Sequence, residues 1–441
     1  MLPVIDVWAS RTGTGIVGAS TSVITADEIA RSPGLTIQDV LSREVGVQTW
    51  STTGGNNGAT TTVDLRGFGA TASSNTLFLL NGRRLNDIDL LGVDLSTIPK
   101  DSSERIEISR GNSGAVLYGG GAVGGVINII TKTGVALPPT ARIEGGFGSF
   151  NQREINGSAA ASSGPFAASV FANGINSDGY RVNSALRERS AIGDLRYTGN
   201  EGKAWAVISG DDQHLGLPGA RLVDQAAGIN QLVTDRRGAT TPTAFADKTG
   251  GSLTLGVSRI IGQGVELIVD GNLRRKNQTA FSTLFGFDTS DVREMTTASI
   301  TPRAIIDSQI FGIPTKITTG VDYYDSTLEA KRSVQLTTRH FTRTISGNNR
   351  PGSTRNKLSV FCRPRTYRGA DASKPRVCLL AIALTRRPQV AHLMHRQFHS
   401  IIQRRITHCI SDLSTGSRRY SLFSAGSHTA SERRTSTSES A

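Results

Sequence analysis

The sequence has no cysteine before residue 362 and no long hydrophobic run. Its three cysteines are Cys362, Cys378 and Cys409. A long stretch without cysteine is compatible with an oxidising compartment such as the periplasm. The longest apolar segment, Val377 to Leu384, is far shorter than the roughly 18 residues of a membrane-spanning helix. If this chain enters a bilayer, we expect it to do so with strands.

Apolar residues are scarce, at 37% of the chain, against a usual share of about 45–50%. Glycine is abundant, with 49 residues among 441. This combination indicates an all-β protein with many turns, or a membrane barrel whose lumen-facing positions are polar. The length allows two or three domains.

The chain also lacks a visible signal peptide. Met1-Leu2-Pro3-Val4 contains neither a basic segment nor an apolar one, and an exported protein should begin with both. We therefore expect a truncated or misplaced start, and the alternative is a cytoplasmic protein.

The body has no net charge. Residues 347–441 contain 17 Lys/Arg and 4 Asp/Glu, which accounts for the whole excess of +13, because 32 residues of each sign remain in 1–346. This segment shows neither helical nor strand periodicity and is rich in Ser and Arg. We expect a disordered basic tail of out-of-frame or foreign sequence, and the alternative is an arm that binds nucleic acid or lipid.

Two short helices and four strands are predicted in the first third of the chain. Thr25 and Thr36 each precede an acid by three residues, Glu28 and Asp39, which is the capping-box pattern of a helix start. Strand-like runs follow at 62–66, 76–81, 104–109 and 126–131. Together they predict an α+β domain at residues 20–134.

After Pro139 the hydrophobic period changes to two. In the run 265–273, for example, Val265, Leu267 and Val269 alternate with Glu266 and Asp270. Such strands of about ten residues are typical of a membrane barrel, although a soluble sandwich alternates similarly. Residues 214–247 show no alternation and predict a long outward loop.

Four glycine-rich motifs follow one another in a fixed order. They are Asp64-Leu65-Arg66-Gly67-Phe68-Gly69, Leu77-Phe78-Leu79-Leu80-Asn81-Gly82-Arg83-Arg84, Leu95-Ser96-Thr97-Ile98-Pro99, and Glu104 to Gly119 continuing through Gly124-Gly125 to Lys132. In this order they resemble the plug domain of TonB-dependent outer-membrane receptors, in which the plug closes the lumen of a large transport barrel.

The resemblance implies four parts of the chain. Residues 1–19 would be an extended segment with a candidate TonB box at Pro3, Val4, Ile5, Asp6 and Val7. Residues 20–134 would be the plug and 140–346 a partial antiparallel β-barrel of about nine or ten strands. Residues 347–441 would be the basic tail. Plugged transporters of this type have about 22 strands, so we expect that this incomplete barrel cannot close.

The resemblance also implies roles for individual residues. Arg66 and Arg110 occupy motif positions whose arginines pair with barrel glutamates and lock the plug. The motif turns would use Gly67, Asn81, Gly82, Gly111, Gly119, Gly124 and Gly125. The implied function is TonB-dependent uptake of a ferric siderophore or cobalamin, with the inner-membrane energising complex and outer-membrane lipid as further partners, and without nucleic acid.

No catalytic constellation, cofactor or metal site is expected. Gly119 to Gly124 fits a dinucleotide-binding pattern, but a β-branched run follows instead of a helix. His392, His395 and His399 are more simply explained by chance clustering than as metal ligands. The sequence therefore predicts a non-enzymatic outer-membrane receptor, as it stands a non-functional fragment. The alternative is a soluble β-rich binding protein with a basic nucleic-acid-binding arm.

Overall fold

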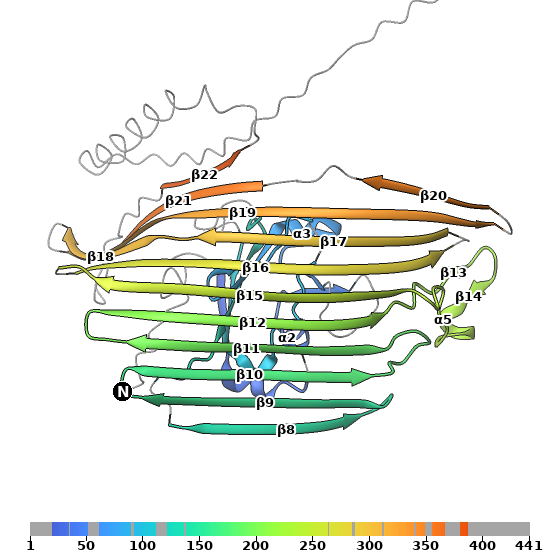
Figure 1. Ribbon diagram of the computed structural model, residues 1–441, viewed down its shortest axis with the longest axis horizontal. Coiled ribbons are helices and arrows are strands. Elements are labelled where there is room, and N and C mark those ends of the chain that lie inside the picture. The colour runs from blue at the N-terminus through green and yellow to red at the C-terminus, as the bar shows by residue number, and fades with distance from the viewer. Residues whose placement is uncertain are drawn as a thin grey trace, which may run out of the picture. The chain divides into compact units, whose positions relative to one another are not determined.

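The computed structural model describes residues 20–34, 36–51, 61–89, 92–111, 121–135, 138–262, 264–284, 287–310, 313–338, 341–348, 355–366 and 380–386. The chain divides into a unit spanning Met1–Arg387 and a second unit, Pro388–Ala441, which lies outside the described residues. The first unit contains a small α+β unit followed by one large antiparallel sheet (Figure 1).

The α+β unit begins with β1 (Ser20–Thr25) and two short helices, α1 (Ala26–Arg31) and α2 (Ile37–Ser42). Both predicted capping boxes are present. The Thr25 hydroxyl accepts from the Glu28 amide while the Glu28 carboxylate accepts from Thr25, and Thr36 and Asp39 repeat this exchange. The two Thr residues therefore fix where the helices begin.

The remaining elements of this unit are short. They are β2 (Gln48–Ser51), β3 (Thr61–Asp64), η1 (Gly69–Thr71), α3 (Ala72–Asn75), β4 (Thr76–Leu80), β5 (Arg83–Arg84), η2 (Lys100–Ser102), β6 (Ser103–Arg110) and β7 (Gly125–Thr131). Strands β4, β6 and β7 match the predicted runs closely. Strand β3 ends earlier than the predicted 66, because the Asp64 carboxylate accepts from the amides of Arg66 and Gly69 and turns the chain.

Five strands form the sheet of this unit in the order β1-β6-β7-β4-β5. Strand β4 runs parallel to β7, and the other pairs are antiparallel. The core lies between this sheet and the two helices. Its fully buried members include Ile37 and Leu41 from α2 and Ile106, Ile127 and Ile129 from the sheet.

The large sheet contains long antiparallel strands in the order β22-β21-β19-β17-β16-β15-β12-β11-β10-β9-β8, with β18 and β20 pairing beside this path. Their bounds are β8 (Thr140–Gly148), β9 (Gln152–Ser163), β10 (Phe166–Ser177), β11 (Leu186–Thr198), β12 (Gly202–Gly216), β15 (Phe245–Ile260), β16 (Val265–Leu284), β17 (Phe287–Ile300), β18 (Arg303–Ile310), β19 (Ile313–Thr338), β20 (Phe341–Asn348), β21 (Arg355–Thr366) and β22 (Leu380–Arg386). Strands β17 and β18 pair with the same two neighbours, β16 and β19, and are separated at Thr301 and Pro302.

The two faces of the large sheet have opposite character. On β15, Leu253, Leu255 and Val257 are exposed, whereas Thr254 and Ser258, at alternate positions, are buried. Exposed apolar side chains recur on the same face of the other strands; examples are Ile155, Val170, Leu195, Ile208, Leu267, Val269, Leu273 and Ile300. The exposed apolar residues thus point away from the α+β unit. The face toward that unit carries the buried polar residues together with an apolar cluster of Phe171, Ile192 and Val207.

The long outward loop is shorter than predicted. Residues 214–216 and 245–247, expected in the loop, continue the β12–β15 ladder, as in the pair His214 and Asp247. The loop therefore runs over residues 217–244 and contains β13 (Val223–Asp224), β14 (Ile229–Asn230) and α5 (Gln231–Thr234). No helix in the described part of the chain is long and apolar enough to cross a membrane.

Part of the stretch expected to lack regular structure is paired. Strand β21 forms a ladder with β19, and β22 forms one with β21. The hydrogen bonds of a β-ladder join backbone groups, so a basic and serine-rich segment can also form them. Most of residues 347–441, including the three His residues considered for metal, lie outside the described residues. The four predicted domain boundaries stay a prediction.

Candidate functional site: the interface with the large sheet

The segment that follows β4 and begins with β5 docks the α+β unit onto the inner face of the large sheet. We call residues 83–96 the docking segment. It carries Arg83, Asp87, Asp89 and Asp94, and each of these four side chains forms an ion pair with a residue of the large sheet. The β4 strand and the Asn81-Gly82 turn precede the docking segment and set its direction. Within the segment, Leu95 is buried in the core of the α+β unit.

Asp94 forms the most deeply buried of these pairs. Its Oδ2 lies 2.9 Å from Nζ of Lys248 on β15, and the two side chains are 5% and 2% exposed. Gln213 on β12 donates to Asp94 Oδ1 at 3.3 Å and also contacts the Ser96 hydroxyl. Burial raises the pKa of Asp94, but Lys248, Lys276 and the Ser96 hydroxyl outweigh it, so the pKa lies below its usual value. Asp94 is therefore a carboxylate at neutral pH.

Asp87 binds two cations of β16. Its carboxylate contacts the Arg274 guanidinium and lies 3.3 Å from Nζ of Lys276. Arg274 also donates to the carbonyl oxygen of Leu85 at 2.9 Å. Asp89 is held by Arg293 of β17 at 3.5 Å. A carboxylate shared by two cations, with a backbone carbonyl held by one of them, fixes both position and direction of the docking segment.

At Arg83 the docking segment supplies the cation of the ion pair and the large sheet supplies the carboxylate. Its guanidinium lies 2.6 Å from Asp270 Oδ1 of β16, and Arg303 of β18 lies 3.2 Å from the other carboxylate oxygen. The Thr301 hydroxyl also donates to Asp270. This group sits where β17 passes into β18, so the break at Thr301 and Pro302 brings Arg303 and Thr301 to one carboxylate.

Arg110, one of the two predicted lock residues, is held inside the α+β unit. Its guanidinium lies 3.0 Å from Glu44 Oε1, and it donates to the Val45 carbonyl at 2.7 Å and the Ser22 hydroxyl at 3.1 Å. The carboxylate that meets Arg110 here is thus not one from the large sheet. These contacts tie the end of β6 to β1 and to the chain after α2.

Arg66, the other predicted lock residue, is exposed, and within the described residues it has no ion pair. Its guanidinium lies over Gly111, where a Cβ would sit 3.1 Å from Nη2. The Arg66 guanidinium therefore lies next to the residue that follows Arg110 in the chain. Their pairing with barrel glutamates stays a prediction.

Four of the residues predicted in motif turns have a positive φ and lie outside any strand, whereas Gly125 is the first residue of β7. Gly67, Gly82 and Gly111 have φ of +77°, +80° and +85°, and Asn81 has φ of +51°. Asn81 exchanges hydrogen bonds with Thr131, which anchors the turn to β7. At Gly125, with φ of +151°, a Cβ would lie 2.5 Å from the Ser109 carbonyl oxygen. Gly124 leaves room for Phe68, whose ring carbon would be 3.1 Å from a Cβ. Gly119 and residues 3–7 lie outside the described residues.

A cavity of about 650 Å³ separates α2 from the large sheet. Thr36, Asp39 and Arg43 line it from the α+β unit, and Phe150 and Arg181 are among the residues that line it from the strand ends. Arg237 of the long loop stacks over Phe150 and Tyr180, with centroid distances of 6.0 and 5.7 Å. Burial and the neighbouring Arg221 lower the pKa of Arg181. The residues that line the cavity thus include two arginines, Arg43 and Arg181, and the aromatic rings of Phe150 and Tyr180.

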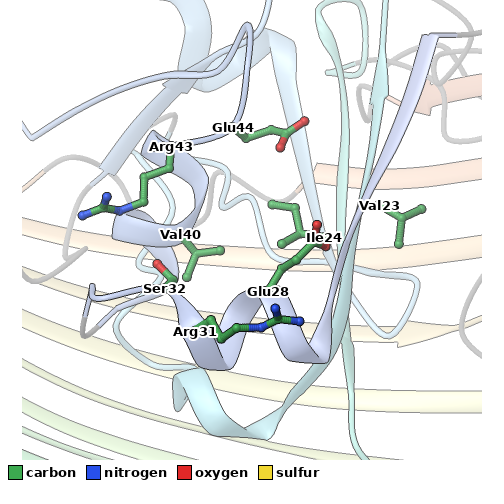
Figure 2. A pocket seen from close by; sticks show the side chains of 8 residues that line it. All are labelled: Val23, Ile24, Glu28, Arg31, Ser32, Val40, Arg43 and Glu44. Carbon is green, nitrogen blue, oxygen red and sulfur yellow. The ribbon is translucent and has the colours of Figure 1, made fainter.

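A second cavity of about 330 Å³ lies within the α+β unit (Figure 2). Its charged residues come from α1 (Glu28 and Arg31) and from the chain just after α2 (Arg43 and Glu44). Glu28 is engaged in the capping box and Glu44 in the pair with Arg110. Its two carboxylates thus already have structural partners.

Comparison with known proteins identifies the small unit. Residues 17–126 match the family model of the TonB-dependent receptor plug domain. The chain carries a TonB-dependent receptor plug domain. Within the plug, the matched residues include every element from β1 to β6 and the entire docking segment.

Two curated receptors resemble part of this chain. The vitamin B12 transporter BtuB of Photobacterium profundum is 41% identical over 145 residues, which are 32% of this chain and 22% of that protein. The ferrienterobactin receptor of Escherichia coli is 38% identical over 126 residues, covering 26% and 16%. The matched region therefore spans about a fifth of the length of these relatives.

The fold of the whole described region resembles that of a solved transporter. The crystal structure of the unliganded ferric citrate transporter FecA superposes with a TM-score of 0.66 at 17% identity, covering 86% of this chain and 61% of that one. The combination of a plug with long antiparallel strands is thus that of TonB-dependent receptors.

The docking segment was not predicted from the sequence. A signal was present, because Asp87, Asp89 and Asp94 follow directly on the Asn-Gly-Arg-Arg turn and are interleaved with apolar residues. The polar positions of β16, among them Asp270, alternate with apolar ones in the same way. What the sequence does not contain is the pairing between them, because the partners lie more than 150 residues apart.

Proposed function

We propose that this chain supplies the plug and the first wall strands of an outer-membrane receptor that takes up a scarce nutrient complex by a TonB-dependent conformational change. The observation that carries the proposal is the inverted large sheet. Its exposed face is apolar, and its polar face receives a plug domain through buried ion pairs.

The inverted sheet argues against the alternative of a soluble binding protein with a nucleic-acid arm. In a soluble sheet the apolar side chains of each strand face the core. Here Leu253, Leu255 and Val257 face outward while Lys248 and Asp270 are buried. That arrangement suits a wall with lipid on one side and a polar lumen on the other.

The cavity of about 650 Å³ supports a ligand face at the loop end of the strands. Barrels of this type have short periplasmic turns and longer extracellular loops. The turn between β9 and β10 is two residues long (Gly164 and Pro165), whereas the loop 217–244 stands at the opposite end. The cavity lined by Phe150 and Arg181 therefore opens on the extracellular side. Its ligand would be a ferric siderophore or cobalamin.

The energising partner would be TonB with its inner-membrane complex. Pro3, Val4, Ile5, Asp6 and Val7 precede β1 in the sequence and are mostly apolar, a composition that suits a segment adding as a strand to a partner sheet. Arg66 and Arg110 would secure the plug until TonB pulls on this segment. Force applied ahead of Ser20 would reach β1 first, and Arg110 ties β1 to the rest of the plug.

The proposal is tested by location and by TonB capture. In the native cells, antibodies against the plug should find the protein in the outer-membrane fraction. The purified full chain in detergent should be retained by the immobilised periplasmic domain of TonB, and Ile5→Pro should abolish retention, because proline removes a ladder donor. Ile143→Pro, a matched change on β8 outside the box, should leave retention intact. A cytosolic location, or equal retention of Ile5→Pro and the unmodified chain, would refute the proposal.

A further inference from the structure

The inner face of β15 and β16 carries three cations in a row, which we call the basic strip: Lys248, Arg274 and Lys276. Lys248 lies opposite Gln278, and Arg274 and Lys276 precede Gln278 by four and two residues on the same strand. Residues at such positions share one face of a sheet. At about 3.4 Å per residue, the strip extends for about 14 Å along the strand direction.

The basic strip is occupied by carboxylates of the plug. Asp87 bridges Arg274 and Lys276, and Asp94 holds Lys248. All five side chains are less than a fifth exposed. Two aspartates on a mobile domain thus fill positions that any ligand with carboxylate, catecholate or phosphate oxygens could fill.

The large sheet provides only part of the countercharge that the strip requires. Asp211 on β12 lies opposite Gly250, which in turn lies opposite Lys276. Asp270 is engaged by Arg83 and Arg303, and Asp291 by Arg293 and Arg332. Removal of Asp87 and Asp94 therefore leaves more positive than negative charge beside the strip.

We propose that the basic strip is an anion-binding site on the transport path. While the lumen is closed, Asp87 and Asp94 of the plug occupy this site in place of a ligand anion. This inference rests on the proposed function and specifies its substrate class: an anionic chelate and not neutral cobalamin. Displacing a plug carboxylate by a ligand anion exchanges one ion pair for another, so the cations are never left unpaired. By linkage, a ligand that binds the strip favours release of the docking segment to the same extent.

The test compares binding of an anionic and a neutral probe to the full chain in detergent. The probes are trianionic ferric tris(catecholate) and cyanocobalamin, each radiolabelled, in equilibrium dialysis at low and at physiological salt. Asp87→Asn frees Arg274 and Lys276, and should bind the trianion about tenfold or more tightly than the unmodified chain at low salt. The gain should shrink as salt rises. Cyanocobalamin binding should not change.

Two controls locate the effect. Asp87→Asn combined with Arg274→Gln and Lys276→Gln should lose the gain, whereas Asp27→Asn, on the exposed face of α1, should show none. Equal trianion affinity in Asp87→Asn and the unmodified chain, or a gain that survives loss of both cations, overturns the proposal. A failure to locate in the outer membrane would instead refute the proposed function, and leaves this comparison standing.

Amide exchange of the unmodified chain gives a second measurement that does not depend on a variant folding. The Leu85 amide donates to the Phe78 carbonyl and the Ser96 amide to Asp94. Saturating ferric tris(catecholate) should speed exchange at both amides severalfold relative to cyanocobalamin, because the docking segment is released. Unchanged or slower exchange would contradict the substitution of plug carboxylates by the ligand.

Discussion

Truncation of Asp94 should destabilise the docked plug more than truncation of any exposed acid. Asp94→Ala leaves the Lys248 ammonium, 2% exposed, without its carboxylate, and removes the oxygen that accepts from Gln213 and from the Ser96 amide. Removing one partner of a buried ion pair costs about 3–5 kcal/mol. Urea denaturation of the full chain in detergent measures this, with Trp8 and Trp205 replaced by Phe so that Trp50 of β2 reports on the plug.

A matched control separates burial from charge. Glu201→Ala removes the partner of Arg259 in a pair whose side chains are 79% and 75% exposed, and should change the unfolding free energy by less than about 0.5 kcal/mol. The double variant Asp94→Leu/Lys248→Met should recover most of the loss, because apolar replacements of a buried pair are often neutral. Equal destabilisation by Asp94→Ala and Glu201→Ala would refute the argument.

Three further predictions concern the plug itself and use the same denaturation assay. Gly125→Ala should cost about 3 kcal/mol or more, since its Cβ would meet Ser109 and Leu65 at 2.5 and 2.6 Å, whereas Gly67→Ala, with open space around it, should cost about 1 kcal/mol; similar costs would contradict the geometry. Thr25→Ala should cost about 1 kcal/mol by removing a capping box, and Thr25→Ser much less; an equal effect of the two would argue against the cap. Burial raises the pKa of Asp64 and of Asp94. Hydrogen bonds to Asp64, and Lys248 together with hydrogen bonds to Asp94, lower these pKa values by more, so both pKa values lie below the usual one. Their contribution to stability is therefore present above about pH 4 and is lost as the pH falls through the depressed pKa values; a plug that becomes more stable below about pH 4 would exclude this.

The local architecture was accessible from the sequence because local chemistry determines it. Thr25 with Glu28 and Thr36 with Asp39 predicted both helix starts, and the β-branched run after Gly125 predicted β7. The alternation in residues 265–273 predicted a two-faced strand, which is part of β16. Such signals involve neighbours in the chain, so composition and spacing contain them.

The docking chemistry was not accessible because it depends on pairs of residues far apart in the chain. The pairing of Arg110 with a barrel glutamate stays a prediction; within the plug its guanidinium lies 3.0 Å from Glu44, which is 66 residues away in the chain. The aspartates of the docking segment alternate with apolar residues in the sequence, and this local pattern does not identify their partners. Its role emerges only when β12, β15, β16 and β17 form one face.

Cross-linking across the Asp94–Lys248 pair tests most directly whether the plug sits on the polar face of the large sheet. Asp94→Cys and Lys248→Cys are combined in the full chain after Cys362, Cys378 and Cys409 are changed to Ser, and a short bis-thiol-reactive reagent is applied to the native host cells. The structure predicts efficient cross-linking in the outer-membrane fraction and none with Asp94→Cys paired to Leu255→Cys, which faces away. Absence of the first cross-link, or equal formation of both, would contradict the docked plug.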